Sequence, residues 1–287
     1  MEVTNRYLNS LSEADLDFII RTVVTKRSDY DEIRGIVKGK GDLIDIMLDD
    51  ERLFRAVMAD DDIFLKLSPF LLFIILLRKV YRDLKETTFT IEPVGKKERL
   101  PVFDAPQVVE LLGDKDICTY LADMLSSFTK VGTTTLYFKN GPTLSKRVFN
   151  DTDLEDVVDL SNILPEDSRF SLYKRAADIC LFLTGVFPDY IFSKEEEGNG
   201  LPKNKEPGNG QGGLEAYEKQ GQMFYRQAAL HKVAKAVGLD RVLLTLSEKF
   251  ILARKPLTII ADRYMGAKRD QWFNQWAQSP TSPGFGA

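Results

Sequence analysis

The chain has 287 residues, of which 44% are hydrophobic and 29% are charged. This balance is typical of a globular protein rather than a disordered one, and the length allows one large domain or two ordinary ones. The formal net charge is −4, from 39 basic and 43 acidic side chains. Because non-specific nucleic-acid binding depends on net positive charge, we expect no nucleic-acid partner.

Several features of the sequence predict a cytoplasmic protein without a membrane segment. The two cysteines, Cys118 and Cys180, lie in apolar helical patterns and are too few for a disulfide framework. The first residues lack the basic and then apolar pattern of a secretory signal. The apolar run at 69–77 is shorter than the about 20 residues that cross a bilayer.

Helical patterns follow one another in residues 1–85, which we treat as an N-terminal helical region. Ser12 and Asp15 form a capping-box pattern that begins the first clear helix. Ser68 followed by Pro69 is typical of another helix start, and this helix is apolar first and basic later. Short helices are predicted between these two starts, at 29–37, at 42–48 and on both sides of 60–62.

Residues 86–150 mix short strands with helices. The alternating segment 88–93 predicts a strand, and 99–103 is its candidate partner, confined to a sheet edge by Pro101. Two β-favouring runs separated by Asn140-Gly141 indicate a hairpin. These runs are 133–139 and 143–149, and the helices expected before them are 108–112 and 116–130.

Residues 151–278 predict a C-terminal helical region built on one core helix. Segment 170–187 becomes apolar on every side after Asp178, and a helix that is apolar all round is surrounded by protein. Pro188 must end that helix. Further helices are expected at 152–164, with Thr152 as its N-cap, at 214–237, at 239–253 and at 256–276. The glycine- and charge-rich stretch 193–213 predicts a flexible loop, and 279–287 a disordered tail.

Together, these patterns predict a mainly α protein with a helical bundle-like core. A minor β-hairpin or small-sheet element is expected at 87–149. We expect the three regions to form one compact domain.

Gly185 and Gly221 each interrupt a helical pattern, at a cost of about 1 kcal/mol relative to alanine. The expected compensation is a close crossing of two helices near these glycines.

The core helix carries LYKRAAD at 172–178 and LFLTGVFP at 181–188, and a later helix carries Tyr217, Gly221 and Tyr225. This pattern resembles a stretch in an uncharacterised family of mainly helical bacterial proteins, which reads roughly LYRRLGD, two residues, then LFLxGFFP. The chain departs from that stretch at Ala177 and Val186. The resemblance implies a helical fold and a bacterial origin, and it implies no activity.

Asp178 lies where its helix becomes fully apolar, so its carboxylate is a candidate binding group. Lys174 and Arg175, one turn earlier, or Arg226 of the later helix could pair with it. Tyr217 and Tyr225 share one face of the later helix. Arg175, Asp178, Tyr217 and Tyr225 therefore form a candidate ligand-binding site. A structural ion pair and ordinary amphipathic tyrosines explain the same pattern, and we favour that explanation.

No residue is assigned a catalytic role, and we expect neither a metal nor a cofactor. His231 is the only histidine, so any Ser–His or Cys–His mechanism would have to use it, and a His-rich metal site is excluded. We interpret His231 itself as structural. Asp42, Asp45 and Asp49 share a helix face, and we interpret them, like the acidic run 60–62, as solvated surface charge.

Charge is distributed unevenly along the chain. Residues 1–62 carry 9 basic and 15 acidic side chains, whereas residues 250–287 carry 5 basic and 2 acidic ones. The basic end also holds Arg269, Trp272 and Trp276, residue types that dominate protein interfaces. We predict a partner-binding surface there, with docking of the last helix onto its own domain as the alternative. The acidic end is a candidate internal or intermolecular partner.

The sequence favours a non-enzymatic interaction or regulatory protein that binds a protein partner. A single histidine and the absence of nucleophile and nucleotide-loop motifs support this interpretation. The alternative is a carboxylate-based enzyme or a small-ligand-binding protein with a pocket around Asp178. The sequence does not decide between enzyme and binding protein, and it leaves the oligomeric state open.

Overall fold

The computed structural model describes residues 6–60, 62–95, 98–130, 132–140, 143–196 and 213–273. Helices make up most of this part of the chain, and its strands form two separate two-stranded antiparallel sheets. The predicted fold class, mainly α with a minor β component, is confirmed. Buried hydrophobic side chains from Tyr7 to Phe273 form one continuous core.

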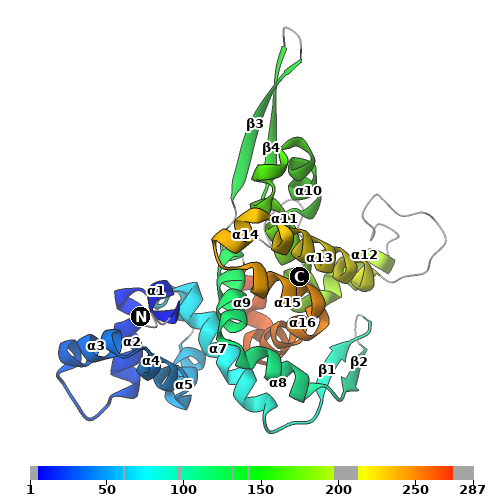
Figure 1. Cartoon of the computed structure of the whole chain (residues 1–287). Helices are drawn as coiled ribbons and strands as arrows, with labels where there is room; N and C mark the ends of the chain where they lie inside the picture. The colour runs from blue at the N-terminus through cyan, green and yellow to red at the C-terminus, as the bar shows by residue number, and fades with distance from the viewer. Residues whose placement is uncertain are drawn as a thin grey trace.

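The N-terminal helices lie together beside the long helix α7 (Figure 1). They are α1 (Arg6–Ser10), α2 (Glu13–Val23), α3 (Tyr30–Gly39), α4 (Gly41–Leu48), α5 (Glu51–Ala59) and α6 (Ile63–Lys66), followed by α7 (Pro69–Leu84). The predicted capping box begins α2, with Ser12 Oγ accepting from Asp15 N at 3.1 Å and Asp15 Oδ2 accepting from Ser12 N at 2.9 Å. The other oxygen of Asp15 accepts from Ser68 N at 2.9 Å, which joins the start of α2 to the start of α7.

A short hairpin and two helices follow α7. They are β1 (Thr90–Pro93), β2 (Arg99–Val102), α8 (Ala105–Gly113) and α9 (Lys115–Ser127). The strands pair antiparallel, with Pro101 opposite Ile91. Each strand of a two-stranded sheet keeps one open edge, and such an edge tolerates a proline that donates no hydrogen bond.

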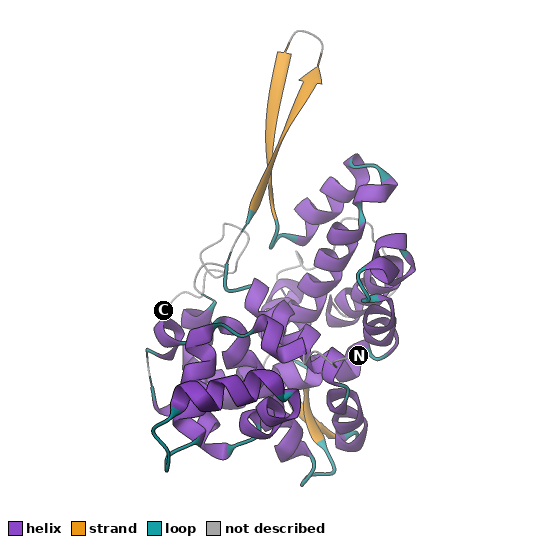
Figure 2. Cartoon of the chain, turned by 60° about the vertical axis from the view of Figure 1, so that its left-hand side comes forward, coloured by secondary structure: helices purple, strands orange, loops and turns teal. Residues whose placement is uncertain are grey.

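A longer ribbon of two strands leaves the helical body and extends well beyond it (Figures 1 and 2). Strands β3 (Thr133–Asn140) and β4 (Thr143–Asn150) pair antiparallel over their whole length. The hairpin predicted from Asn140-Gly141 is thus confirmed. Near its base the ribbon leans on α10 (Leu154–Ile163), where the ring of Phe149 is buried and Arg147 pairs with Asp159 at 2.6 Å.

The C-terminal helices pack against α11, the predicted core helix. The helices are α11 (Phe170–Val186), α12 (Pro188–Glu196), α13 (Gly213–Leu230), α14 (Lys232–Ala236), α15 (Asp240–Glu248), α16 (Phe250–Ile259) and α17 (Arg269–Trp272). Shorter turns lie at Glu166–Ser168, Ile260–Met265 and Gly266–Lys268. Every residue of α11 from Ala176 onward is buried, as its apolar sequence predicts.

Helices α11 and α12 hold the apolar segment whose ability to span a membrane has to be considered. None of the described helices is by itself long and apolar enough to span a bilayer. The two helices meet that criterion only as a pair, and the chain bends by 94° between them at Pro188. The apolar part of α11 is buried inside the protein.

The predicted N-cap of α10 is one residue too early. Asp153 caps this helix, because its Oδ1 accepts from Glu155 N at 2.8 Å and from Asp156 N at 3.1 Å. The hydroxyl of Thr152 instead donates to Asn150 Oδ1 at 2.7 Å and is buried at the end of the ribbon. A capping-box spacing alone therefore placed the helix start incorrectly.

The helix predicted at 214–237 is two helices. α13 ends at Leu230, and His231 is the N-cap of α14, with its Nδ1 accepting from Val233 N at 3.2 Å. Its Nε2 lies 3.1 Å from the carbonyl oxygen of Glu166. The single histidine thus has the structural role that we predicted for it.

The helix break predicted before Pro256 is also wrong. Helix α16 runs through Pro256, and the break lies at Lys249, between α15 and α16. Arg254 and Lys255, just before the proline, are both buried in ion pairs with other elements. These tertiary contacts hold the segment helical and override the local preference of proline.

The predicted loop at 193–213 falls mostly outside the described residues. Its first residues, 193–196, belong to α12, and its last, Gly213, begins α13. Residues 197–212 and the predicted tail at 279–287 lie outside the part of the chain that the structure describes.

Candidate functional site

Asp178 is the centre of a polar cluster in the core of the helical body. Tyr120 of α9 and Tyr225 of α13 donate to its Oδ1, at 2.7 and 2.8 Å. Lys174, one turn earlier on α11, donates to its Oδ2 at 2.8 Å. Three helices therefore meet at this carboxylate, which is only 1% exposed.

The two tyrosines at this cluster act as permanent hydrogen-bond donors. Burial raises the pKa of Tyr120 well above its ordinary value, and the charge of Asp178 raises it further. The pKa of Tyr225 is raised for the same two reasons. Both phenols stay protonated, and the carboxylate accepts from both of them and from an ammonium group. This arrangement stabilises a buried charge and leaves it closed to an external ligand.

The structure brings together only part of the predicted ligand site. Of the four predicted residues, Asp178 and Tyr225 are in direct contact. Arg175 turns away, because it donates to Asp151 O at 2.6 Å and to Ser127 Oγ at 2.7 Å. Its guanidinium also lies over the ring of Phe128, 4.0 Å from the ring centre. Arg175, one of the possible partners of Asp178, therefore bonds to other residues among the described contacts.

Two other residues considered beside Asp178 also lie elsewhere. Tyr217 packs against the core without a hydrogen bond to Asp178, and burial raises its pKa. Arg226 is exposed on the outer side of α13. Sequence reasoning missed Tyr120, which is 58 positions away along the chain. Lys174, a possible partner because it lies four residues before Asp178, does pair with it at 2.8 Å.

The glycines explain how α13 approaches its neighbours. A Cβ on Gly221 would lie 2.4 Å from the ring of Phe250 and 2.9 Å from Cβ of Cys180. Gly221 thus allows α13 to pack closely on both α11 and α16, as predicted for a helix crossing. Gly185 faces α16 instead, with a built Cβ 2.7 Å from Cβ of Leu257. The two glycines therefore serve two different contacts.

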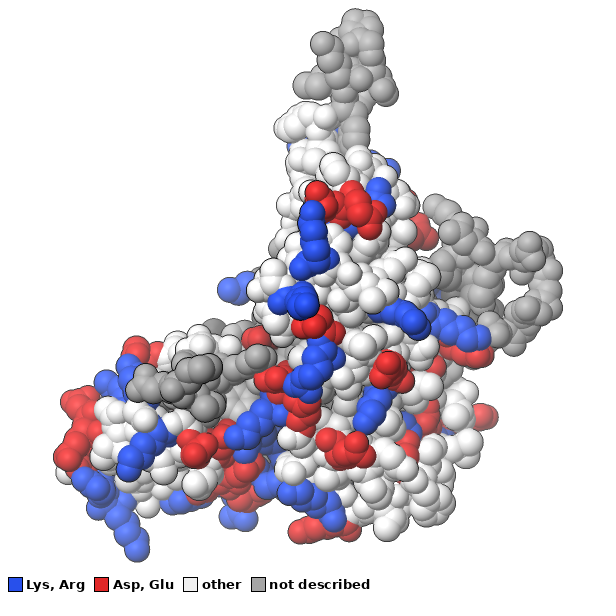
Figure 3. Space-filling model, in the orientation of Figure 1, with Lys and Arg blue, Asp and Glu red and all other residues white. Residues whose placement is uncertain are grey.

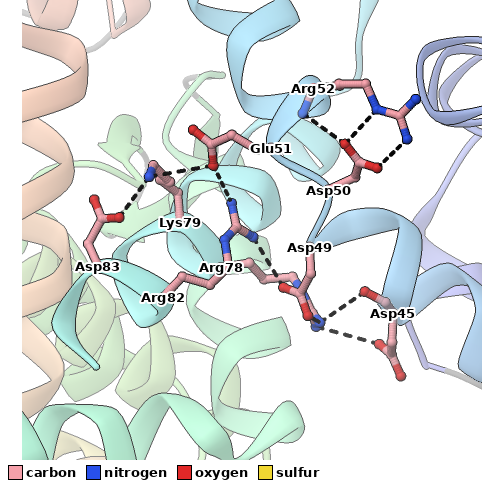
Figure 4. Close-up of polar contacts among 9 residues, drawn as sticks. All are labelled: Asp45, Asp49, Asp50, Glu51, Arg52, Arg78, Lys79, Arg82 and Asp83. Carbon is pink, nitrogen blue, oxygen red and sulfur yellow. Dashed lines mark hydrogen bonds and ion pairs between the residues drawn. The ribbon is translucent and has the colours of Figure 1, made fainter. Parts of the chain in front are cut away.

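A second charged cluster joins the N-terminal helices to α7 (Figure 4). Arg78 pairs with Asp49 at 2.6 Å and with Asp45 at 3.5 Å, and Arg82 pairs with Asp49 at 3.2 Å. Lys79 of the same helix pairs with Glu51 at 3.5 Å. Asp45 is buried, so the interpretation of this acidic face as solvated is wrong at Asp45, whereas the Asp49 side chain is 40% exposed. The basic half of α7 thus pairs with these two carboxylates and with Glu51, whose side chain is 42% exposed.

A third cluster fixes α16 to the first hairpin. The Arg254 side chain is 1% exposed, and its Nε lies 3.2 Å from Glu218 Oε1 of α13. Lys255 pairs with Glu92 of β1 at 2.9 Å and with Asp104. Burial raises the pKa of Glu218, although Arg254 opposes that shift. Two of the basic residues at the C-terminal end, Arg254 and Lys255, thus form structural ion pairs inside the protein.

The predicted partner surface at the last helix is also part of the body. Trp272 is buried, at 7% exposure, so its ring is not a surface anchor. Arg269 donates to Val186 O at 3.2 Å, and its guanidinium lies over the ring of Phe187. Phe273, next to Trp272, packs in the core at 0% exposure. The alternative, docking of this helix onto its own domain, is what the structure shows. Trp276 lies outside the described residues.

Apolar side chains on the ribbon reach solvent, as several on the helical body also do. Tyr137 of β3 is 63% exposed and Val148 of β4 is 48% exposed. The described part of the ribbon is mostly uncharged on the face seen in Figure 3, whereas charges of both signs cover the helices below it. Tyr137 is directly opposite Lys146 in the register, and Val148 is opposite Thr135. Residues paired in this way share a face, so this exposed face combines aromatic, β-branched and basic side chains.

Fold and sites together define a mainly helical body, closed by internal charge pairs, with one projecting β ribbon. No protein-family model, curated protein or solved structure matches the chain.

Proposed function

We propose that the chain is a non-enzymatic interaction protein whose partner-binding element is the β3–β4 ribbon. The observation that carries this proposal is the position of Tyr137, which is 63% exposed on a ribbon that extends away from the body. Tyrosine is enriched in protein interfaces because it combines an apolar ring with a polar tip. A protein partner therefore fits this surface.

The stability of the ribbon gives a second reason. A two-stranded hairpin without further packing is only marginally stable in water. This ribbon leans on α10 only near its base, where Phe149 is buried. Even there, Thr133, Thr134 and Thr135 of β3 are exposed. A partner that covers these strands would supply packing that the described part of the chain does not.

The state of Asp178 supports the binding role over the enzymatic alternative. A carboxylate in acid–base catalysis must reach a substrate proton directly or through one water. Asp178 is 1% exposed, and its two oxygens accept from Tyr120, Tyr225 and Lys174. The described cluster therefore serves as a structural centre of the body.

Site-specific photo-crosslinking in cells tests the proposal. A benzophenone amino acid replaces Tyr137 in the full chain, and in the matched control it replaces Leu230, which is 76% exposed on the helical body. We expect one discrete adduct from position 137 and none from position 230. Equal labelling from both positions, or none from position 137 in a chain that melts like the wild type, would contradict the proposal.

A further inference from the structure

We propose that the occupant of the ribbon is a second copy of this chain, with the two β3 strands paired antiparallel about a two-fold axis. The inference rests on the proposed function, because it names the partner of the same ribbon. Two observations support this inference. The first is the set of backbone groups of β3 and β4 that point outward, and the second is the difference in protection between the two strand edges.

Hydrogen bonding at the base of the ribbon shows which groups point outward. Asp151 N donates to Gly132 O at 3.1 Å and Gly132 N donates to Asp151 Oδ1 at 2.8 Å, so these two residues bond to each other across the ribbon. Hydrogen-bonded and non-bonded pairs alternate along an antiparallel ladder. The next pair, Thr133 with Asn150, is therefore non-bonded and directs its N–H and C=O groups away from the ribbon. By the same alternation, Thr135 and Tyr137 present outward groups along the edge of β3.

The edge of β4 is already protected. The outward N–H of Asn150 donates to Asp156 Oδ2 of α10 at 2.9 Å. Farther along the strand, Lys146 places a positive charge beside the edge, and Arg147 pairs with Asp159 of α10 at 2.6 Å. Charged side chains and covering helices are the usual ways in which proteins block strand addition. A further strand is thus disfavoured at β4.

The edge of β3 has neither protection. Its segment from Thr133 to Tyr137 carries no charge and no proline. Within the described chain, no side chain or loop bonds to the outward groups of Thr133, Thr135 and Tyr137. A row of open N–H and C=O groups of this kind is a template for another strand. The unprotected edge therefore selects β3 as the strand that receives the partner.

The sequence of β3 is complementary to itself in one register. If Leu136 lies on the two-fold axis, Thr135 of one copy is opposite Tyr137 of the other, and Thr133 is opposite Lys139. All outward-facing positions of the strand then pair, and no two like charges are opposed. Pairs of aromatic with β-branched residues favour such sheets. Leu136 meets its own copy on the other face.

The shape of the molecule permits this pairing. The ribbon extends beyond the helical body (Figure 1), so two antiparallel ribbons place the two bodies at opposite ends of a four-stranded sheet. Sheets of three or more strands are more stable than an isolated hairpin. The dimer thereby also supplies the missing packing of the ribbon.

Sedimentation of the full chain over a range of concentrations tests the dimer. We expect reversible dimerisation of the wild type and a Kd raised about tenfold or more in Thr135→Pro, which removes an outward N–H from each copy. Val148→Pro is the matched control, because Val148 is directly opposite Thr135 and its N–H faces the β4 edge. Its Kd should stay within about twofold of the wild type if both variants melt alike.

A disulfide test fixes the register. Cys118 and Cys180 are buried, so a cysteine added to the ribbon is far more accessible than either. Under oxidation by copper phenanthroline in air, Leu136→Cys should give a covalent dimer and Thr134→Cys should not, because only residue 136 meets its own copy. Monomeric wild type at every concentration would overturn the second-copy proposal. So would a dimer that both proline variants leave unchanged. The crosslink from position 137 would then still report whether the ribbon binds another protein.

Discussion

At the scale of single residues, the buried charges are satisfied by partners from distant parts of the chain. Asp178 is the clearest case, because Tyr120 and Tyr225 come from two other helices and both donate to one oxygen. The desolvation of such a carboxylate is costly, and only a full set of donors offsets it. We therefore assign Asp178 to stability and to the relative placement of α9, α11 and α13.

Replacing Asp178 should destabilise the body strongly. Asp178→Ala leaves two phenols and an ammonium group without their acceptor, so we expect a loss of about 3–5 kcal/mol in the free energy of unfolding. Asp178→Asn keeps one acceptor oxygen and should cost less. Denaturant unfolding measures both, with Asp42→Ala at an exposed position of α4 as the control. A midpoint for Asp178→Ala equal to that of the wild type would show that the cluster contributes nothing.

At the scale of elements, the close packing of α13 on α11 and α16 depends on a missing side chain. Gly221 is buried between Phe250 and Cys180, and a methyl group there would overlap both. Gly35 in α3 offers a comparison, because a Cβ on it would meet nothing within 4 Å. The same substitution should therefore have opposite effects at the two helical positions.

Gly221→Ala should lower the free energy of unfolding by about 1–3 kcal/mol, because overpacking forces the helices apart. Gly35→Ala should raise it by about 0.5–1 kcal/mol through helix propensity alone. Thermal and denaturant unfolding of the two variants side by side checks both signs. If alanine at position 221 also stabilised the protein, the close contact described here would be wrong.

Much of the element order follows from local signals, and the exceptions have tertiary causes. Ser12 and Ser68 marked helix starts correctly, and Asn140-Gly141 marked the hairpin, because caps and tight turns are determined by neighbouring residues. The helix start predicted at Pro256 was wrong, because buried ion pairs of Arg254 and Lys255 keep the chain helical through the proline. Local rules do not contain that information.

The candidate site was less accessible to sequence reasoning than the fold. Lys174 could be placed beside Asp178 from helical spacing, but Tyr120 could not, since only the packing of α9 brings it there. Trp272 has the residue type of an interface anchor, yet packing buries it. The exposed edge of β3 follows only from the alternation of ladder bonds, which no composition rule reveals.

At the scale of the whole molecule, charged residues near both ends of the described chain pair with other elements of the same chain. Arg78 and Arg82 of α7 pair with Asp49 of the N-terminal helices (Figure 4). At the basic end, Arg254 pairs with Glu92 and Glu218. The ribbon stands apart from this network of closed contacts. Its outward edge is therefore the part of the described surface that we assign to binding.

Hydrogen exchange at single-amide resolution tests that assignment most directly. At concentrations where the full chain is associated, the outward amides of Thr133, Thr135 and Tyr137 should be protected, and dilution should remove their protection. The inward amides of Thr134 and Leu136, which bond to β4, should stay protected in both conditions. The assignment would be contradicted if the outward amides exchanged at the rate of an unfolded peptide at every concentration while the inward amides stayed protected.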